Sequence, residues 1–336
     1  LFSFNKGLPL TIRSVFYPLL GERVWGWPGH IIDILAVLAT LFGLATSLGF
    51  GASQATSGLH YLFDIPLGNT TQVILVIFIT AVALISVVRG LDAGVKKLSE
   101  INMILAFLLF IFVVAVGPTL DIVSGFFKSI SAYFEYLPEL ANPIGREDSN
   151  YASGWSTFYW AWWISWSPFV GMFIARVSRG RTVREFIISV LVIPSLACVF
   201  WMTAFGGTAI KQVVEDNYQK VAEADLPLQL FAMLDVLPLS SITSFIAIVL
   251  VIVFFVTSSD SGSLVIDVIA AGGKVDAPTP QRVFWCLFEG LIAISLILGG
   301  GLVALQAMAV STGLPFTIVL LVAAFSMVKG LMSEPR

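Results

Sequence analysis

Eight apolar runs, each long enough to cross a lipid bilayer, dominate this sequence of 336 residues. A helix needs about 20 apolar residues to cross roughly 30 Å of hydrocarbon. The runs lie at residues 31–57, 71–88, 101–118, 154–177, 186–206, 240–270, 283–305 and 313–332. Only 12% of the residues are charged, whereas soluble domains average about 25%. The sequence therefore predicts an all-α integral membrane protein with eight transmembrane helices.

The lysines and arginines are unevenly distributed among the linkers. All but four of the 18 fall on the side that holds both ends of the chain, and the exceptions are Lys128, Arg146, Lys211 and Lys220. Cytoplasmic loops of membrane proteins carry an excess of Lys and Arg. We therefore expect a multi-pass protein of the cell (inner or plasma) membrane with both termini of this chain cytoplasmic.

The linkers complete the predicted organisation. Residues 1–30 form a cytoplasmic entry segment, 31–118 three transmembrane helices, 119–153 a periplasmic interfacial helix and loop, 154–332 five transmembrane helices, and 333–336 a cytoplasmic tail. Within the periplasmic segment, aromatic and aliphatic residues at helical spacing predict an amphipathic helix lying along the membrane interface. The first residues read as a loop within a longer chain, so we expect the sequence to be a fragment.

Enzyme and channel functions find little support. The two histidines lie at opposite ends of the first span, and neither an HExxH nor a GxSxG motif occurs. A channel would be expected to show a ring of like residues or a repeated filter segment. No enzymatic activity is expected, and a channel is the less favoured alternative to a carrier.

The stretch FYWAWWISWSPF at 158–169 holds four of the nine tryptophans. On a helix, Trp162, Trp163 and Trp166 fall within an arc of about 100°, and Trp160 lies about 60° beyond Trp163. The cluster lies midway along its span rather than at the ends, where interfacial aromatic belts occur. A binding role, packing against other helices and an interfacial belt are the three alternatives.

An indole face can hold a ligand that few other side chains can hold. A quaternary ammonium group has no N–H to donate and cannot lose its charge, but aromatic rings attract it by about 2 kcal/mol or more when water is excluded. A fixed carboxylate at the same depth would cost several kcal/mol while the site is empty. The tryptophan cluster therefore favours a cage for a trimethylammonium compound.

Pro168 interrupts the hydrogen bonding of the same predicted helix. A proline has no N–H, so it leaves the carbonyl of Ile164 without its usual partner. Inside a membrane that carbonyl requires another donor. Ser165, Ser167 or a water molecule is expected to supply it.

Hydroxyl groups concentrate in VTSSDSGS at 256–263, inside an otherwise apolar run. Hydroxyl oxygens suit small hard cations such as Na⁺. Hydrogen bonding between helices or back to the preceding turn is the alternative. Asp260 is a candidate ion-binding residue because an ionisable group within a membrane span is a functional candidate by default.

Several segments together resemble one family of transporters. WSTFYWAWWISWSPFVGMFIARVSRGRTVREF at 155–186 resembles the signature stretch of the betaine/choline/carnitine transporters. The further matching segments are IDILAVLATLFGLATSLGFGASQ at 32–54, LSEINMILAFLLFIFVVAVGPT at 98–119, FFVTSSDSGS at 254–263 and APTPQRVFW at 277–285. The resemblance covers nearly the whole chain.

The resemblance implies a fold, a function and an assembly. The fold is a pair of inverted five-helix repeats, of which this chain would hold the end of the first and all of the second, without the N-terminal transmembrane helices. The function is import of a quaternary ammonium solute by alternating access, glycine betaine first and choline second, with carnitine or ectoine as alternatives. A homotrimer in the lipid bilayer, with a small-molecule partner and no nucleic acid, is expected.

The resemblance also assigns site residues. Trp163 would face the central site, and Trp162 and Trp166 would line the path toward the cytoplasm. Phe169 would follow one turn further on, and Trp160 is the weaker candidate.

For the coupling ion, Thr257 and Ser258 match a Thr-Ser pair that ligates Na⁺, with Phe254 one turn before them. Thr40 matches one hydroxyl of a second sodium site, but Leu44 stands where another threonine can occur. Coupling to one Na⁺, to H⁺ or to neither stays open, and no cofactor other than a coupling Na⁺ is expected.

Overall fold

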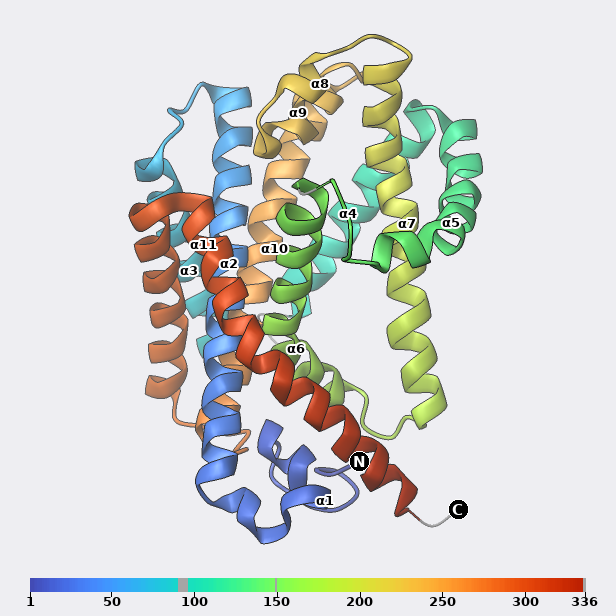
Figure 1. Cartoon of the computed structure of the whole chain (residues 1–336). Coiled ribbons are helices and arrows are strands. Elements are labelled where there is room, and N and C mark those ends of the chain that lie inside the picture. The colour runs from blue at the N-terminus through green and yellow to red at the C-terminus, as the bar shows by residue number, and fades with distance from the viewer. Residues whose placement is uncertain (90–95, 149, 335–336) are drawn as a thin grey trace.

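The computed structural model of the chain describes residues 1–89, 96–148 and 150–334, and every regular element within them is a helix (Figure 1). The longer ones are α2 (Trp27–Phe63), α3 (Asn69–Arg89), α4 (Lys96–Val116), α5 (Thr119–Ala141), α6 (Phe158–Val177), α7 (Val183–Val214), α10 (Ser240–Ala270) and α11 (Thr279–Met332). The shorter ones are η1 (Ile12–Phe16), α1 (Tyr17–Leu20), η2 (Gly21–Trp25), η4 (Asn150–Thr157), α8 (Lys220–Glu223), η5 (Leu226–Leu228) and α9 (Gln229–Asp235). The all-α prediction is confirmed. Arg336 and the end of the predicted tail lie outside the described residues.

Among the described residues, six helices, not eight, are long and apolar enough by themselves to qualify as membrane spans: α2, α3, α4, α7, α10 and α11. The helix α6 is 20 residues long but does not qualify, because its tryptophans and serines lower its hydropathy. The other difference arises because the last two predicted spans form one element, α11, of 54 residues. The number of membrane crossings therefore stays a prediction.

The predicted linker at 306–312 is wrong, because the chain is helical there. The interruption of α11 falls instead at Gly300 and Gly301, where φ and ψ leave the helical region. Gly301 has φ 61° and ψ −142°, a conformation that is essentially confined to glycine. The run of three glycines at 299–301 therefore divides α11 into two halves, whereas residues 306–309 are good helix formers.

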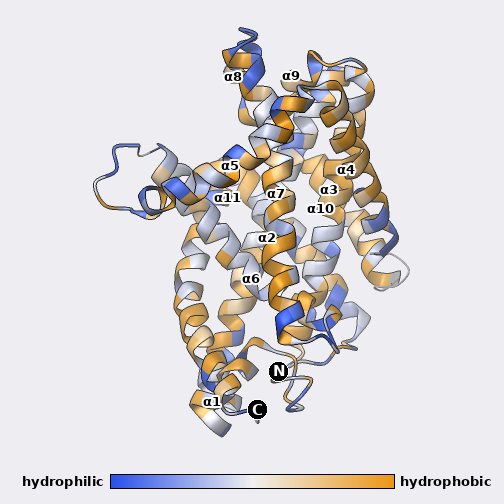
Figure 2. Ribbon diagram, turned by 90° about the vertical axis from the view of Figure 1, so that its right-hand side faces the viewer, coloured by the Kyte–Doolittle hydropathy of each residue, from blue (hydrophilic) through white to orange (hydrophobic). Residues whose placement is uncertain are grey.

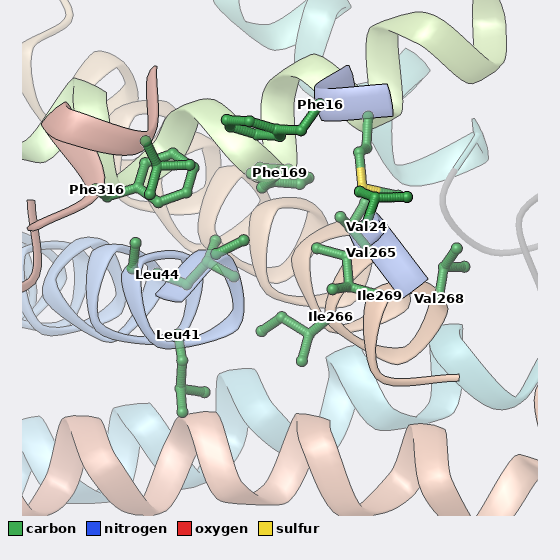
Figure 3. Packing of buried hydrophobic residues seen from close by; sticks show 14 residues of the cluster. Phe16, Val24, Leu41, Leu44, Phe169, Val265, Ile266, Val268, Ile269 and Phe316 are labelled. Atoms are coloured by element: carbon green, nitrogen blue, oxygen red, sulfur yellow. The ribbon is translucent and has the colours of Figure 1, made fainter. Parts of the chain in front are cut away.

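The helix α2 is the centre of the bundle and packs against α3, α6, α10 and both halves of the long α11. Glycines at its interfaces allow close approach: a Cβ on Gly51 would overlap the ring of Phe255, and a Cβ on Gly262 would overlap Leu44. Small residues commonly serve this purpose between membrane helices. Figure 3 shows Leu41 and Leu44 of α2 beside Val265, Ile266 and Ile269 of α10, with Phe169 of α6 and Phe316 of α11.

The N-terminal segment closes one end of this core. It was predicted as a loop over 1–30, but it folds into η1, α1 and η2, and α2 begins earlier than expected, with Pro28 in its first turn. Phe16 and Val24 are buried in the same cluster as Phe169 (Figure 3). The Ser326 hydroxyl donates to the Val15 carbonyl at 2.7 Å. The segment therefore holds the C-terminal half of α11 against the core.

A second group of helices lies at the other edge of the molecule, where α5 packs against α7 (Figure 1). A helix, α5, lies within the predicted periplasmic segment; it buries Ile122 and exposes Phe127 and Phe134, and its place along the membrane interface stays a prediction. The hydropathy colouring in Figure 2 shows apolar residues along the middle of the long helices and hydrophilic ones towards their ends. This distribution suits a bilayer, although the orientation in the membrane stays a prediction.

Replacing Gly301 by Ala tests the glycine break in α11. We expect the free energy of unfolding to fall by about 1–3 kcal/mol, because alanine at this φ and ψ is strained. No atom lies within 4 Å of the added Cβ, so steric overlap would not contribute. The helical neighbour Gly299 also has nothing within 4 Å, and Gly299→Ala is the matched control. Thermal unfolding of the purified protein measures both, and equal midpoints for the two variants would contradict the assignment.

Candidate substrate and ion sites

The tryptophan helix α6 lies between α2 and the second half of α11. On the α2 side, a Cβ on Gly43 would come within 2.9 Å of the Trp166 ring and 3.1 Å of the Ser165 Cβ. On the α11 side, the buried Ser165 hydroxyl donates to the Ala309 carbonyl at 3.1 Å. The helix α6 is therefore fixed on two sides by close contacts that only small residues permit.

The carbonyl of Gly43 anchors two of the predicted indoles. The Nε1–H of Trp162 donates to this oxygen at 3.2 Å and to the Ser47 hydroxyl at 3.1 Å. The Nε1–H of Trp166 donates to the same carbonyl at 3.1 Å. An indole N–H away from water needs such a partner. The polar edges of both rings are thus used within the protein, and their faces are left for apolar or cationic contacts.

The rings form a continuous aromatic row. Trp162 stacks on Phe50 and on Phe158, with centroids 5.5 and 5.4 Å apart. Trp166 meets Trp162 edge to face at 6.4 Å and Phe169 at 5.5 Å. The structure therefore brings together Trp162 and Trp166, which the spacing placed on one face, and Phe169, which was named from the resemblance. Phe50 and Phe158 join them, and neither was identified from the sequence.

Trp163 and Trp160 are placed differently. Their side chains are 70% and 72% exposed on this chain, and Trp163 contacts the ring of Tyr159 edge to face at 6.5 Å. The arc of about 100° is wide enough that Trp162 and Trp166 reach α2 while Trp163 does not. Trp163 therefore lies at the surface of this chain beside Tyr159, and its role at the central site stays a prediction.

The Ile164 carbonyl, which Pro168 leaves without a backbone N–H donor, accepts a hydrogen bond from a residue of α6. The Ser167 hydroxyl donates to the Ile164 carbonyl at 2.7 Å. This confirms the expectation that a nearby serine satisfies the freed oxygen, as membrane helices with internal prolines require. Ser165, the other candidate, is used between helices instead.

The candidate sodium ligands Thr257 and Ser258 lie on α10 between its two close contacts with α2, at Phe255 and at Gly262. The Thr257 hydroxyl donates back to the carbonyl of Phe254 at 2.8 Å, which is the structural alternative foreseen for it. That bond uses the hydroxyl hydrogen and leaves oxygen lone pairs that can still ligate a cation. Both side chains are half-buried and Phe254 is exposed, so the pair is accessible on this chain.

The hydroxyl of Thr40 is fully buried and has no hydrogen-bond partner among the described residues. Leu44, one turn further on, fills the notch at Gly262 and offers no oxygen there. Asp260 is also fully buried, and it accepts hydrogen bonds from Ser86 at 2.6 Å and from Ser261 at 3.0 Å. Thr40 on α2 and Asp260 on α10 therefore lie on two helices that pack on each other, and only Asp260 is hydrogen-bonded among the described residues.

Membrane-length helices with aromatic and hydroxyl groups gathered between them are typical of solute transporters, which bind their substrates within the membrane. In a comparison with protein-family models, the model described as BCCT, betaine/carnitine/choline family transporter, matches residues 1–336. The chain belongs to this family, as its motifs indicated, and the family consists of transporters rather than enzymes.

Three curated relatives illustrate the similarity. A glycine betaine/proline/choline transporter of Vibrio parahaemolyticus is 72% identical over 336 residues, which are 100% of this chain and 61% of the relative. Glycine betaine transporter 1 of the same organism is 57% identical, with 99% of this chain and 64% of the relative covered. A glycine betaine transporter of Acinetobacter baylyi is 43% identical, with 98% and 50% covered. The chain thus spans less than two thirds of the length of these relatives.

Substitution of Gly43 by Ala tests the seating of α6. The added Cβ would push Trp166 and Ser165 away from α2, and overpacking of this kind costs about 1–3 kcal/mol. We expect a lower unfolding midpoint of the purified protein. Gly206→Ala in α7, where the added Cβ has nothing within 4 Å, is the control and is expected to retain the wild-type midpoint. An unchanged midpoint for Gly43→Ala would show that this contact does not hold α6 against α2.

Proposed function

We propose that this protein transports a quaternary ammonium solute across the cell membrane by alternating access, with glycine betaine as the first candidate and choline as the second. The match of the whole chain to the transporter family supports the class of activity. The relative with 72% identity, named as a glycine betaine/proline/choline transporter, supports the class of substrate. The observation that carries the proposal is the row of indoles whose N–H groups are bound to α2.

The anchored indoles suit a permanent cation. Because their N–H edges are bound to Gly43, the rings are held in position before a substrate arrives. Attraction of an ammonium group to a ring face is about 2 kcal/mol or more in a water-excluded site, and it needs no fixed negative charge. Trp163 would supply a further face from the open side of the row, and Phe169 would continue it.

The proposed architecture is the inverted five-helix repeat. The helices α2, α3 and α4 would end the first repeat, and α6, α7, α10 and the two halves of α11 would form the second. The break at Gly300 and Gly301 supports counting α11 as two crossings. We further propose a homotrimer with both ends of this chain cytoplasmic, for which the distribution of lysines and arginines is the support for orientation.

Coupling to Na⁺ through Thr257 and Ser258 is part of the proposal. Their position between two contacts of α10 with α2 would let a bound ion hold these helices together. Leu44 in place of a hydroxyl argues against a second ion at Thr40. Proton coupling and exchange are the alternatives to Na⁺ coupling. The choice of substrate is a separate question, which competition by carnitine, ectoine and proline with the uptake of glycine betaine decides.

The cage is tested by Trp163→Leu against Trp160→Leu. The two tryptophans lie on the same helix and are nearly equally exposed, so loss of an aromatic surface alone would affect both alike. We expect Trp163→Leu to abolish saturable uptake of glycine betaine while the protein remains in the membrane. Loss of one face at about 2 kcal/mol alone corresponds to roughly a thirtyfold weaker affinity. Trp160→Leu is expected to retain uptake, and unchanged affinity of Trp163→Leu would refute the cage.

The sodium ligands are tested by combining Thr257→Ala with Ser258→Ala. An interaction with a charged group contributes about 1.5–3 kcal/mol, so the Na⁺ concentration for half-maximal uptake should rise by about tenfold or more. Thr312→Ala in α11 is a matched control, because Thr312 is a half-buried threonine that also donates back to its own helix. Sodium dependence equal to that of the wild type would assign Thr257 and Ser258 to packing.

A further inference from the structure

The aromatic row of α6 continues beyond the indoles, towards the end of the bundle at which both chain termini lie (Figure 1). The ring of Phe169 is followed by that of Phe173, with centroids 6.3 Å apart. Phe173, together with Met172 and Arg176, lines a small cavity between α6 and α10. This cavity therefore lies one turn of α6 beyond Phe169, between the aromatic row and that end of the bundle.

The cavity has a third wall, which the N-terminal segment supplies. This segment comprises residues 1–26, and its half-buried Leu10 faces the cavity. Leu10 also packs against the apolar cluster that contains Phe169. The remaining lining residues belong to α10 and are Ser261, Leu264, Val265 and Val268. One apolar side chain from outside the two helices thus completes the wall of a space between them.

The N-terminal segment is fastened to α2 and α11 by polar contacts. The backbone N–H of Arg13 donates to one carboxylate oxygen of Asp33 on α2 at 3.0 Å, and its guanidinium pairs with the other. Asp33 is 4% exposed, and breaking a buried ion pair of this kind is strongly destabilising. On α11, Ser326 donates to the Val15 carbonyl. The segment is therefore held in place on these two helices.

The turn between α10 and α11 holds the residues that carry Leu10. Gly273 in this turn has φ 92°, and a Cβ there would lie 2.7 Å from the Leu10 nitrogen and 2.9 Å from the Pro9 Cβ. Arg282 pairs with the buried Asp267 at 3.2 Å and ties the start of α11 to α10. The backbone at Leu10 is thus seated on the α10–α11 turn.

The contacts of the N-terminal segment with α6 are of another kind. Its hydrogen bonds and ion pairs to the rest of the chain lead to α2, to α11 and to Glu334, and none within the described residues leads to α6. Beyond α6, the guanidinium of Arg179 lies over the ring of Phe4 at 5.7 Å, and both residues are exposed. Apolar contacts have no directional requirement, so two apolar surfaces can separate and meet again. The boundary between Leu10 and α6 is therefore the one that can open.

We propose that Leu10 is the stationary half of a gate between the aromatic row and the end of the bundle that holds both termini, and that α6, with Met172 and Phe173, is the moving half. The inference rests on the proposed transport function, because a carrier opens its site to one side at a time. With both termini cytoplasmic, the gate controls release of the substrate into the cell. The N-terminal segment stays on α2, α10 and α11 while α6 moves away from it.

The gate is tested first by a measurement that needs neither substrate nor uptake. Val268→Cys places a thiol in the cavity wall of the full-length protein, after exposed cysteines such as Cys198 have been replaced by serine. The rate at which a charged, water-soluble thiol reagent modifies this cysteine reports access to the cavity. We expect Leu10→Ala to raise the rate severalfold, because it removes the side chain that closes the third wall. Leu8→Ala, at a half-buried leucine of the same segment that does not line the cavity, is the matched control.

General loosening of the protein is excluded with a second reporter. Ile266 is fully buried on the same helix and does not line the cavity, so Ile266→Cys should stay unmodified in both leucine variants. Equal modification of Val268→Cys in Leu10→Ala and Leu8→Ala would overturn the gate. So would a rise at Ile266→Cys that matches the rise at Val268→Cys.

Two reversible cross-links then separate the stationary half from the moving half. A disulfide between Pro9→Cys and Gly273→Cys joins parts that stay together, and their Cβ positions need to move apart only slightly to reach the usual disulfide spacing. A short bifunctional thiol reagent between Leu10→Cys and Phe173→Cys joins Leu10 to α6. We expect the first link to leave uptake of glycine betaine unchanged and the second to abolish it until a reductant is added. Each single cysteine variant is the control, and Gly273→Cys alone shows the effect of strain at its positive φ.

The other patterns contradict the proposal. Loss of uptake through the Pro9–Gly273 disulfide would show that the N-terminal segment itself must move. Full uptake with Leu10 linked to Phe173 would show that this boundary does not open. If the unlinked variants take up no glycine betaine, the proposed substrate fails, and the modification rates at Val268→Cys alone decide whether Leu10 closes the cavity.

Discussion

The carbonyl oxygen of Gly43 is the point on which the candidate site depends. It accepts the indole N–H groups of Trp162 and Trp166, and the hydroxyl of Ser47 donates to it as well, at 3.0 Å. A polar group inside a membrane cannot form hydrogen bonds to water, so every donor needs an acceptor within the protein. Here that requirement fixes two large rings against α2 by hydrogen bonds that use only their N–H edges. A cation that cannot be gripped by hydrogen bonds can then be held by rings that are already in place.

The same requirement explains the other polar residues between the helices. The Ser167 hydroxyl satisfies the carbonyl that Pro168 leaves free, and Arg13 and Arg282 compensate two of the buried acids. Several buried polar atoms among the described residues depart from this pattern, including the Thr40 hydroxyl and the Oε1 atom of Glu289. In a chain that belongs to a transporter family, such departures direct attention to ions that are bound and released. Thr40 and the hydroxyl-rich segment of α10 each lie only a few residues from a close helix contact, at Gly43 on α2 and at Gly262 on α10.

Sequence and structure agree where the controlling interaction is local. The amphipathic α5 and the Ser167 hydrogen bond follow from helical spacing and from the chemistry of proline, and both were predicted. The break in α11 was misplaced, because hydropathy favoured a linker after residue 305 while the backbone is interrupted where three glycines occur together. The helical arc grouped Trp163 with Trp162 and Trp166, but it could not show which edge of that arc meets α2. Phe50 was missed because its partner lies more than a hundred residues away, although its place seven residues after Gly43 puts it on the same face of α2.

A structure of the full-length protein with glycine betaine bound would test the central claim most directly. We predict that the trimethylammonium group lies within about 6 Å of the ring centroids of Trp162, Trp163 and Trp166. The N–H groups of Trp162 and Trp166 should still donate to Gly43. An ammonium group bound beside a carboxylate such as Asp260, or a Trp163 ring that faces acyl chains while the substrate sits elsewhere, would contradict the account.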